Sequence, residues 1–245
     1  PALSLLCKWD CGWYESIARQ GYLSPIPPIH QDSEHSNVAF FPAYPLLGRA
    51  FAWLLQIPLT WALPLVSMTC ASLVSIALYR LLAAETRGSR WFRYAVLVAY
   101  PASFYLFVSY SEALYLSAML GGTALMMSTQ ERAKRTALPL IIVAGIALGG
   151  TRLTGFVIPS FLLLAALLLR DSARLRASAF FLGAAGSATA FFAFCAVKFG
   201  HWNLYFQQLA IGWERIMEDG PRLQAALLLL ARWSDHALRS DGPFR

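Results

Sequence analysis

Long runs of apolar residues are the feature of this 245-residue sequence that most restricts what it can fold into. Several runs approach the roughly 20 residues that an α-helix needs to cross about 30 Å of hydrocarbon. Hydrophobic residues make up 58% of the chain and charged residues only 13%, which is far more apolar than an ordinary soluble domain. Because a segment inside a bilayer must satisfy its own backbone hydrogen bonds, the sequence predicts an all-α, polytopic transmembrane helical bundle.

The chain is predicted to form one domain over residues 1–245, with an interfacial helix followed by a series of spans. Segment 43–56 carries Arg49 and Gln56 among Leu, Phe and Trp, as is typical of a helix at the membrane surface. The predicted spans are 58–82, 91–109, 111–129, 137–150, 153–169 and 177–198, with a shorter apolar run at 223–233. We expect a fragment that lacks a leading helix and later C-terminal helices.

The distribution of positive charge predicts the orientation of these spans. Three connections, 80–93, 130–136 and 170–176, hold ten of the chain's twenty Lys and Arg residues. Basic loops stay on the cytoplasmic side of a membrane, so the opposite connections and the opening loop are predicted to face away from the cytoplasm. The net charge of +7 therefore reflects membrane topology, and no nucleic-acid partner is predicted, since no binding motif accompanies the basic loops.

The cysteines are too scattered to predict a metal site or a disulfide framework. Cys7, Cys11, Cys70 and Cys195 form no C-x-x-C pair. No clear D-x-D motif is present either, so a metal-bound nucleotide sugar is not indicated, and the sequence leaves a divalent-metal requirement open.

Unusual polar residues gather on the less basic side of the predicted bundle. They lie in four segments: Asp10 with Glu15, then 109–112, 151–154 and 201–208. Ionisable groups near a membrane are costly and mark candidate functional sites. We therefore predict that these segments converge at one end of the bundle.

Four motifs carry a resemblance to a known family. The stretch "WDCGWYESIARQGY", residues 9–22, and the stretch "NVAFFPAYPLL", residues 37–47, are similar to two signatures of the GPI mannosyltransferase 2 family and its bacterial relatives. "SYSEALY" at 109–115 and "GGTRLTGF" at 149–156 resemble two further elements of that family, in the same order. One departure is Leu153, where many relatives have Pro.

The resemblance implies a membrane glycosyltransferase with the C-type fold, in which a non-cytoplasmic first loop carries short interfacial helices. Such an enzyme transfers a hexose, here most simply mannose, from a polyprenyl-phosphate donor to a glycolipid or glycan acceptor. The implied location is the bacterial cytoplasmic membrane, as a multi-pass protein with its active site on the external face.

The motif positions supply the candidate site residues. Asp10 is the candidate catalytic base and Glu112 the second catalytic candidate. A guanidinium group suits a phosphate, so Arg152, with Lys8 or Lys198, is the candidate ligand of the donor phosphate. The candidate substrate-binding residues are Trp13, Tyr14 and Tyr110.

Structural interpretations of the same residues stay open at this point. Asp10 could cap the helix that begins near Cys11, and Glu112 could be a first-turn acid that interacts with the helix dipole. Arg152 could snorkel towards the membrane surface, while Trp13 and Tyr14 could be interfacial anchors.

Two other classes of protein compete with the enzyme. A transporter or flippase also needs polar groups inside a helical bundle, but should show repeated, interrupted helices near the midplane. A noncatalytic membrane subunit is the third hypothesis, and the acidic Asp10 argues against it.

Overall fold

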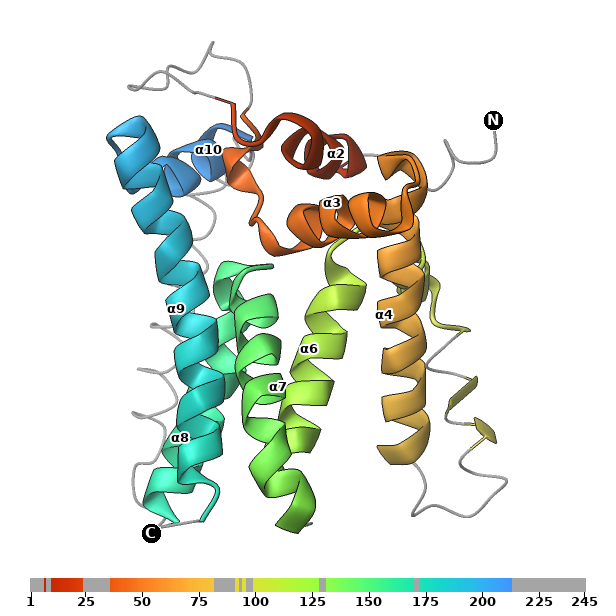
Figure 1. Ribbon diagram of the computed structural model, residues 1–245, viewed down its shortest axis with the longest axis vertical. Helices are drawn as coiled ribbons and strands as arrows, with labels where there is room; N and C mark the ends of the chain where they lie inside the picture. Colours follow the sequence, from red (N-terminus) through yellow and green to blue (C-terminus); the bar gives the residue numbers. More distant parts are fainter. Residues whose placement is uncertain are drawn as a thin grey trace, which may run out of the picture.

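The computed structural model describes residues 7, 10–23, 36–81, 91–92, 94–95, 99–127, 131–169 and 172–212. Within these ranges every regular element is a helix, which confirms the all-α prediction for this part of the chain. Five helices run along the long axis: α4 (Leu59–Leu81), α6 (Glu112–Met127), α7 (Glu131–Gly149), α8 (Val157–Leu168) and α9 (Arg174–Phe199). Figure 1 shows α2 (Cys11–Gln20), α3 (Ala43–Leu55) and α10 (Leu204–Gly212) gathered at one end, called the α2–α3 end below.

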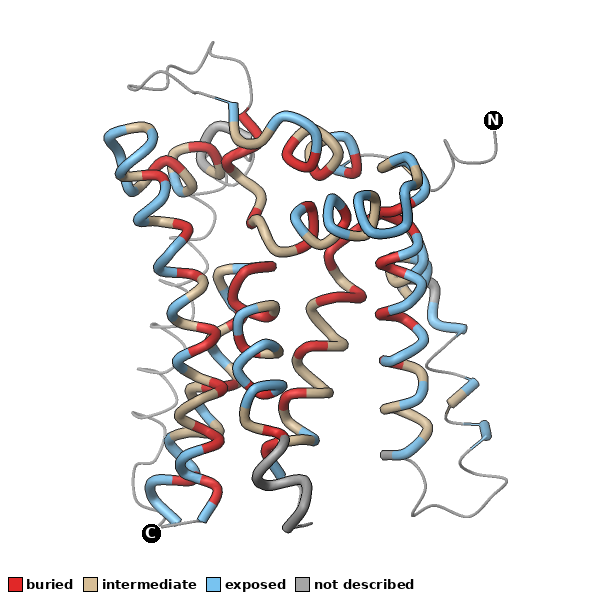
Figure 2. The backbone as a smooth tube through the Cα atoms, in the orientation of Figure 1, coloured by how far each residue is buried: buried red, intermediate tan, exposed pale blue. Residues whose placement is uncertain are grey.

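Two of the described helices, α4 over Leu59–Arg80 and α9, are long and apolar enough to cross a membrane. Helices α6, α7 and α8 are apolar but shorter. Large apolar side chains are exposed along the bundle, including Leu73 on α4, Phe161 on α8 and Val197 on α9. Soluble monomers rarely expose so much apolar surface, so the outer faces fit a hydrocarbon environment (Figure 2).

Helix α3 confirms the helix predicted at 43–56. Pro42 and Pro45 lie at its start, where a missing backbone N–H costs nothing because no carbonyl is there to receive it. The helix ends at Gln56, whose φ of 53° lies in the left-handed region. The chain then turns at Pro58 into α4, so α3 lies across the end of the bundle instead of entering it.

Helices α7 and α9 pack closely because glycines line their contact. A Cβ atom added at Gly149 would strike the backbone carbonyl of Ala184, and one added at Gly183 would lie 2.7 Å from the carbonyl oxygen of Ile142. Small residues let two backbones approach in this way. The turn that follows Gly149 is thereby held at a fixed place beside α3, where the N–H of Ala43 donates to the carbonyl oxygen of Gly150 at 2.8 Å.

Two predicted boundaries are wrong. The span predicted at 91–109 does not continue through its second half, where a 3-10 helix η3 (Pro101–Leu106) and a bend lead to Ser111. Pro101 explains the break, since proline and the residue before it disfavour an uninterrupted helix. Helix α7 begins at Glu131, six residues before the predicted start, because its first turns are charged and the apolar pattern misses them.

The prediction that the cysteines form no disulfide is also wrong. Cys7 and Cys11 are joined, with their Cα atoms 5.1 Å apart, while Cys70 and Cys195 are free and buried. The two bonded cysteines bracket Asp10 and lie where α2 begins.

Candidate functional site

A polar pocket of about 640 Å³ opens at the α2–α3 end of the bundle. It collects side chains from the start of α2, the segment before α3, the η3–α6 region, the turn after α7 and α10. Its lining residues are Asp10, Tyr14, Ala39, Phe40, Phe41, Tyr105, Tyr110, Glu112, Thr151, Arg152, Leu153, Thr154 and Tyr205. The four polar segments singled out in the sequence therefore each contribute to one cavity.

Asp10 immediately precedes α2, but its side chain does not cap that helix. The backbone carbonyl of Asp10 accepts the N–H of Trp13 at 3.0 Å, which begins the helix without the carboxylate. The carboxylate makes no hydrogen bond or ion pair with any described residue. The capping interpretation is therefore wrong, and the carboxylate lines the pocket instead.

The electrostatic surroundings of Asp10 act in opposite directions. Its side chain is exposed at the rim, yet the adjoining protein removes enough water to raise the pKa of the carboxyl above its usual range. The positive charge of Arg152 opposes that effect and lowers the pKa. A raised pKa strengthens a carboxylate as a base, which is what proton transfer near neutral pH requires.

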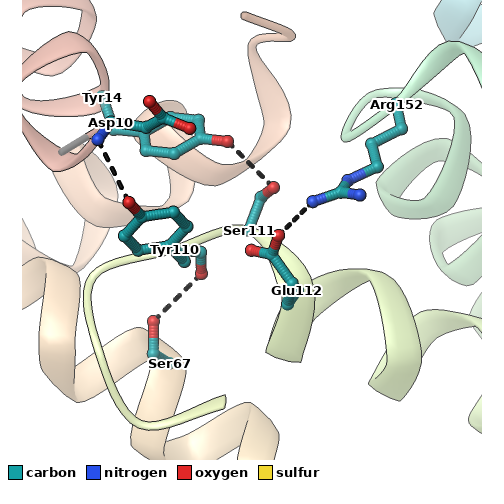
Figure 3. Close-up of polar contacts among 7 residues, drawn as sticks. All are labelled: Asp10, Tyr14, Ser67, Tyr110, Ser111, Glu112 and Arg152. Carbon is teal, nitrogen blue, oxygen red and sulfur yellow. Dashed lines mark hydrogen bonds and ion pairs between the residues drawn. The ribbon is translucent and has the colours of Figure 1, made fainter. Parts of the chain in front are cut away.

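Hydrogen bonds tie Asp10 and α2 to the loop before α6, as Figure 3 shows. The backbone N–H of Asp10 donates to the phenol oxygen of Tyr110 at 3.1 Å. The phenol oxygen of Tyr14 lies 3.0 Å from Oγ of Ser111 in a buried contact. Burial raises the pKa of both phenols, so both stay protonated and can act as donors.

A second layer of bonds supports that loop from below. Oγ of Ser67, on α4, donates to the backbone carbonyl of Tyr110 at 3.2 Å and lies 2.8 Å from the phenol oxygen of Tyr44. Ser67 and Tyr44 are fully buried. The loop that carries Tyr110, Ser111 and Glu112 is thus fixed against α2, α3 and α4.

Glu112 and Arg152 form an ion pair inside the pocket. Oε1 of Glu112 accepts from a guanidinium N–H of Arg152, while its Oε2 is buried and has no hydrogen-bond partner among the described residues. The Arg152 guanidinium carbon also lies 5.9 Å from the ring centre of Tyr115. A buried carboxylate oxygen without a donor is unfavourable, and a ligand hydroxyl would satisfy it.

The pair bears on two structural interpretations. Glu112 is the first residue of α6, so it interacts with the helix dipole as expected of a first-turn acid, but it also faces Arg152 (Figure 3). Arg152 does not simply snorkel, because its side chain reaches Glu112 from the turn after α7.

Several sequence candidates lie elsewhere. Trp13 does not line the pocket; its ring stacks on Phe40, with the ring centres 6.1 Å apart. Lys8 lies outside the described residues. Glu15 pairs with Arg19 on the surface of α2, and Lys198 lines a separate groove.

The sequence did not single out some lining residues. Tyr105 was missed because its segment was interpreted as a membrane span, although Pro101 signals the break. Phe40 and Phe41 belong to the motif at 37–47 but were not among the candidate site residues; they pack against Tyr14 and Phe191 while forming the pocket wall. Tyr205, from α10, lies in the polar segment 201–208 that the sequence did single out, although it was not among the candidate site residues.

Comparison of the chain with protein-family models, curated proteins and solved structures gives no match. Among the residues that the structure describes, no group of three or more His, Cys, Asp and Glu side chains could hold a metal ion. The pocket combines a carboxylate that has no partner among the described residues, an acid and a guanidinium in contact, and a wall of aromatic rings.

Proposed function

We propose that the chain is a multi-pass membrane glycosyltransferase that transfers a hexose, with mannose as the first candidate, from a polyprenyl-phosphate donor to a glycolipid or glycan acceptor. The observation that carries the proposal is the pocket at the α2–α3 end. It contains the Asp10 carboxylate, which has no hydrogen-bond or ion-pair partner among the described residues, together with Arg152. The motif resemblance supplies the class of reaction, and the pocket is where its motifs meet.

In the proposed reaction, the Asp10 carboxylate accepts the proton of an acceptor hydroxyl. The hydroxyl oxygen then forms a bond to the anomeric carbon of the donor sugar, and the bond from that carbon to the phosphate oxygen breaks. The departing phosphate keeps the bonding electrons, and Arg152 stabilises its charge. A single displacement of this kind inverts the anomeric centre.

Before a donor binds, Arg152 is paired with Glu112. An incoming phosphate can use the guanidinium donors that Glu112 does not occupy, since one Arg offers five N–H groups. A turn of the Glu112 side chain on phosphate binding would expose its Oε2, which is buried and has no partner among the described residues, to a sugar hydroxyl. Glu112 thereby has a binding role in the same step, and it is the alternative base if Asp10 is not.

Two observations support an external location for the pocket. The helix ends that flank the three basic connections lie at the opposite end of the bundle from α2 and α3 (Figure 1). The Cys7–Cys11 disulfide lies at the α2–α3 end, and disulfides persist in oxidising compartments such as the bacterial periplasm. Both favour placing the pocket away from the cytoplasm in a bacterial cytoplasmic membrane.

The transporter hypothesis gains less support from the same geometry. Substrate sites of secondary transporters lie near the bilayer midplane, between repeated units. The polar pocket here is at one end of the bundle, where a membrane-bound donor and an external acceptor can meet.

The direct test uses the purified full chain in detergent with radiolabelled polyprenyl-phosphate mannose and a panel of lipid acceptors. We expect label from polyprenyl-phosphate mannose to appear in an acceptor. When radiolabelled nucleotide-linked mannose is supplied instead, we expect no labelled acceptor. Labelled acceptor formed from the nucleotide sugar would contradict the proposal. Transport of the unmodified labelled donor across proteoliposome membranes, without any transfer product, would also contradict it.

A further inference from the structure

A second cavity, larger than the polar pocket, lies on the other side of the α3–α7 contact. This groove has a volume of about 1100 Å³ and runs between α3, α7 and α9. Its wall is almost wholly apolar, with Ile142 and Ile146 from α7 facing Leu182 and Ala190 from α9. Such a wall suits hydrocarbon and offers little to a sugar.

The groove and the polar pocket are separated by backbone. Pro42 and Gly150 line the groove, whereas their neighbours Phe41 and Thr151 line the pocket. The hydrogen bond from Ala43 N–H to the Gly150 carbonyl oxygen joins the two segments at 2.8 Å. The Ala43–Gly150 contact therefore forms part of the wall between the groove and the polar pocket that holds Arg152.

Two cations stand at the α2–α3 end of the groove. Arg49 comes from α3 and Lys198 from the last turn of α9, and none of the lining residues is acidic. Arg49 forms no ion pair within the part of the chain that the structure describes. The charge of the groove is thus complementary to an anionic head group.

The Lys198 side chain is held in place by neighbouring residues. Its Nζ donates to the carbonyl oxygen of Tyr22 at 2.9 Å and lies 5.5 Å and 5.3 Å from the ring centres of Phe194 and Phe199. A lysine ammonium has three donors, so two remain for a phosphate. Fixing the side chain in advance reduces the entropy that binding would cost.

The groove is long enough beside α9 for an acyl chain. Its lining residues on α9 run from Leu175 to Lys198, which corresponds to about 35 Å of helix and exceeds half of the about 30 Å hydrocarbon thickness. At Gly186 an added Cβ would meet no atom within 4 Å, so the groove has room beside α9 for an acyl chain.

From this geometry we propose that the groove binds an anionic phospholipid of the same leaflet, with its phosphate between Arg49 and Lys198 and an acyl chain passing Gly186. The site depends on the membrane location of the chain and not on glycosyl transfer. Its loss and the loss of transferase activity can therefore be told apart.

The test titrates the purified full chain, stripped of lipid, with phosphatidylglycerol and with phosphatidylcholine, and counts bound lipid by native mass spectrometry. We expect one phosphatidylglycerol to bind at least about tenfold more tightly than phosphatidylcholine, a difference of roughly 1.4 kcal/mol. Equal affinity of the two lipids would overturn the proposal. Displacement of phosphatidylglycerol by polyprenyl phosphate at tenfold lower concentration would also overturn it, because the groove would then belong to the donor's tail.

Variants locate the site. Lys198→Gln keeps a donor for the Tyr22 carbonyl but removes the charge, and together with Arg49→Gln it should abolish the preference for phosphatidylglycerol. Gly186→Leu fills the groove and should weaken both lipids at least tenfold. Gly121→Leu is the matched control, since Gly121 on α6 also has no atom near its Cβ position but does not line the groove. Wild-type binding by Gly186→Leu, or an equal loss in Gly121→Leu, would place the lipid elsewhere.

Discussion

Asp10 carries the main chemical hypothesis at the scale of single residues. From the sequence, the residues around Asp10 could be identified only as members of shared motifs. The sequence does not show which side chains contact one another, because those contacts depend on helix register. The bond from the Asp10 backbone to Tyr110, one hundred residues away, is an example. What the sequence did predict was that the segments meet, since charge asymmetry places all four on one side of the membrane.

The first residue-scale prediction concerns Asp10→Asn. A general base contributes about 10²- to 10⁴-fold to a rate, so turnover at saturating donor should fall by that order. Folding should be unchanged, because the Asp10 side chain caps nothing in α2. Glu15→Gln is the control: it neutralises an acid on the same helix that pairs with Arg19 outside the pocket. Near-normal turnover by Asp10→Asn would transfer the role of base to Glu112.

A second prediction follows from the raised pKa of Asp10. The carboxylate must be ionised to accept a proton, so kcat/KM should fall on the acid side as Asp10 becomes protonated. Arg152 lowers this pKa, and Arg152→Gln should therefore move the acid limb of the residual activity to higher pH. Arg19→Gln should leave the limb in place. If the acid limb in the pH profile of kcat/KM is the same in Arg152→Gln as in the wild type, the titrating group is not Asp10.

Arg152→Lys tests the proposed phosphate ligand. Lysine keeps the charge but loses the planar fork that can hold Glu112 and a phosphate together. We expect KM for the donor to rise about tenfold or more, with a smaller change in kcat. Arg19→Lys, in the exposed pair with Glu15, should change neither constant. Equal donor KM in wild type and Arg152→Lys would leave Arg152 as a partner of Glu112 alone.

At the scale of elements, apolar runs predicted helices well where they were uninterrupted, as in α4 and α9. Apolar runs did not predict the helix boundaries correctly where charged residues or a proline determine them. The start of α7 is charged, and Pro101 divides the segment predicted as a span. The Cys7–Cys11 disulfide was missed because a four-residue spacing by itself has no distinctive sequence pattern.

The close contact of α7 with α9 gives an element-scale prediction. Gly149→Ala would press a methyl group against the Ala184 carbonyl, and overpacking of this kind typically costs about 1–3 kcal/mol. Gly121→Ala, in the middle of α6 with open space at its Cβ position, should be neutral or stabilising because alanine favours helix. Thermal unfolding in detergent, followed by circular dichroism, measures both. Equal midpoints for the two variants would mean that the helices do not approach this closely.

At the scale of the whole molecule, the polar pocket and the disulfide lie at one end of the helical bundle, and the apolar groove runs from that end along α7 and α9. The composition predicted the bundle, and the loop charges predicted which residues share an end. Neither could predict the groove, because its shape depends on how closely α7 and α9 approach at their glycines. The proposed function depends on that end facing away from the cytoplasm.

Sidedness must be established before activity is assigned to a face. Single cysteines at Gly12 and Ser172, in a background without the four native cysteines, serve this purpose, because both positions are exposed and lie at opposite ends of the bundle. Ser111 is unsuitable because it is buried. We expect an impermeant thiol reagent to label Gly12→Cys in right-side-out vesicles and Ser172→Cys in inverted ones.

The most direct measurement of the central claim is the initial rate of sugar transfer in sealed vesicles of the two orientations, containing the full chain with its native cysteines. Radiolabelled polyprenyl-phosphate mannose and an acceptor are added to the outer leaflet. We expect transfer in right-side-out vesicles, little in inverted ones until detergent opens them, and none above background with Asp10→Asn in either. Transfer confined to inverted vesicles would contradict a transferase site in the pocket at the α2–α3 end, and equal transfer by Asp10→Asn would contradict Asp10 as its base.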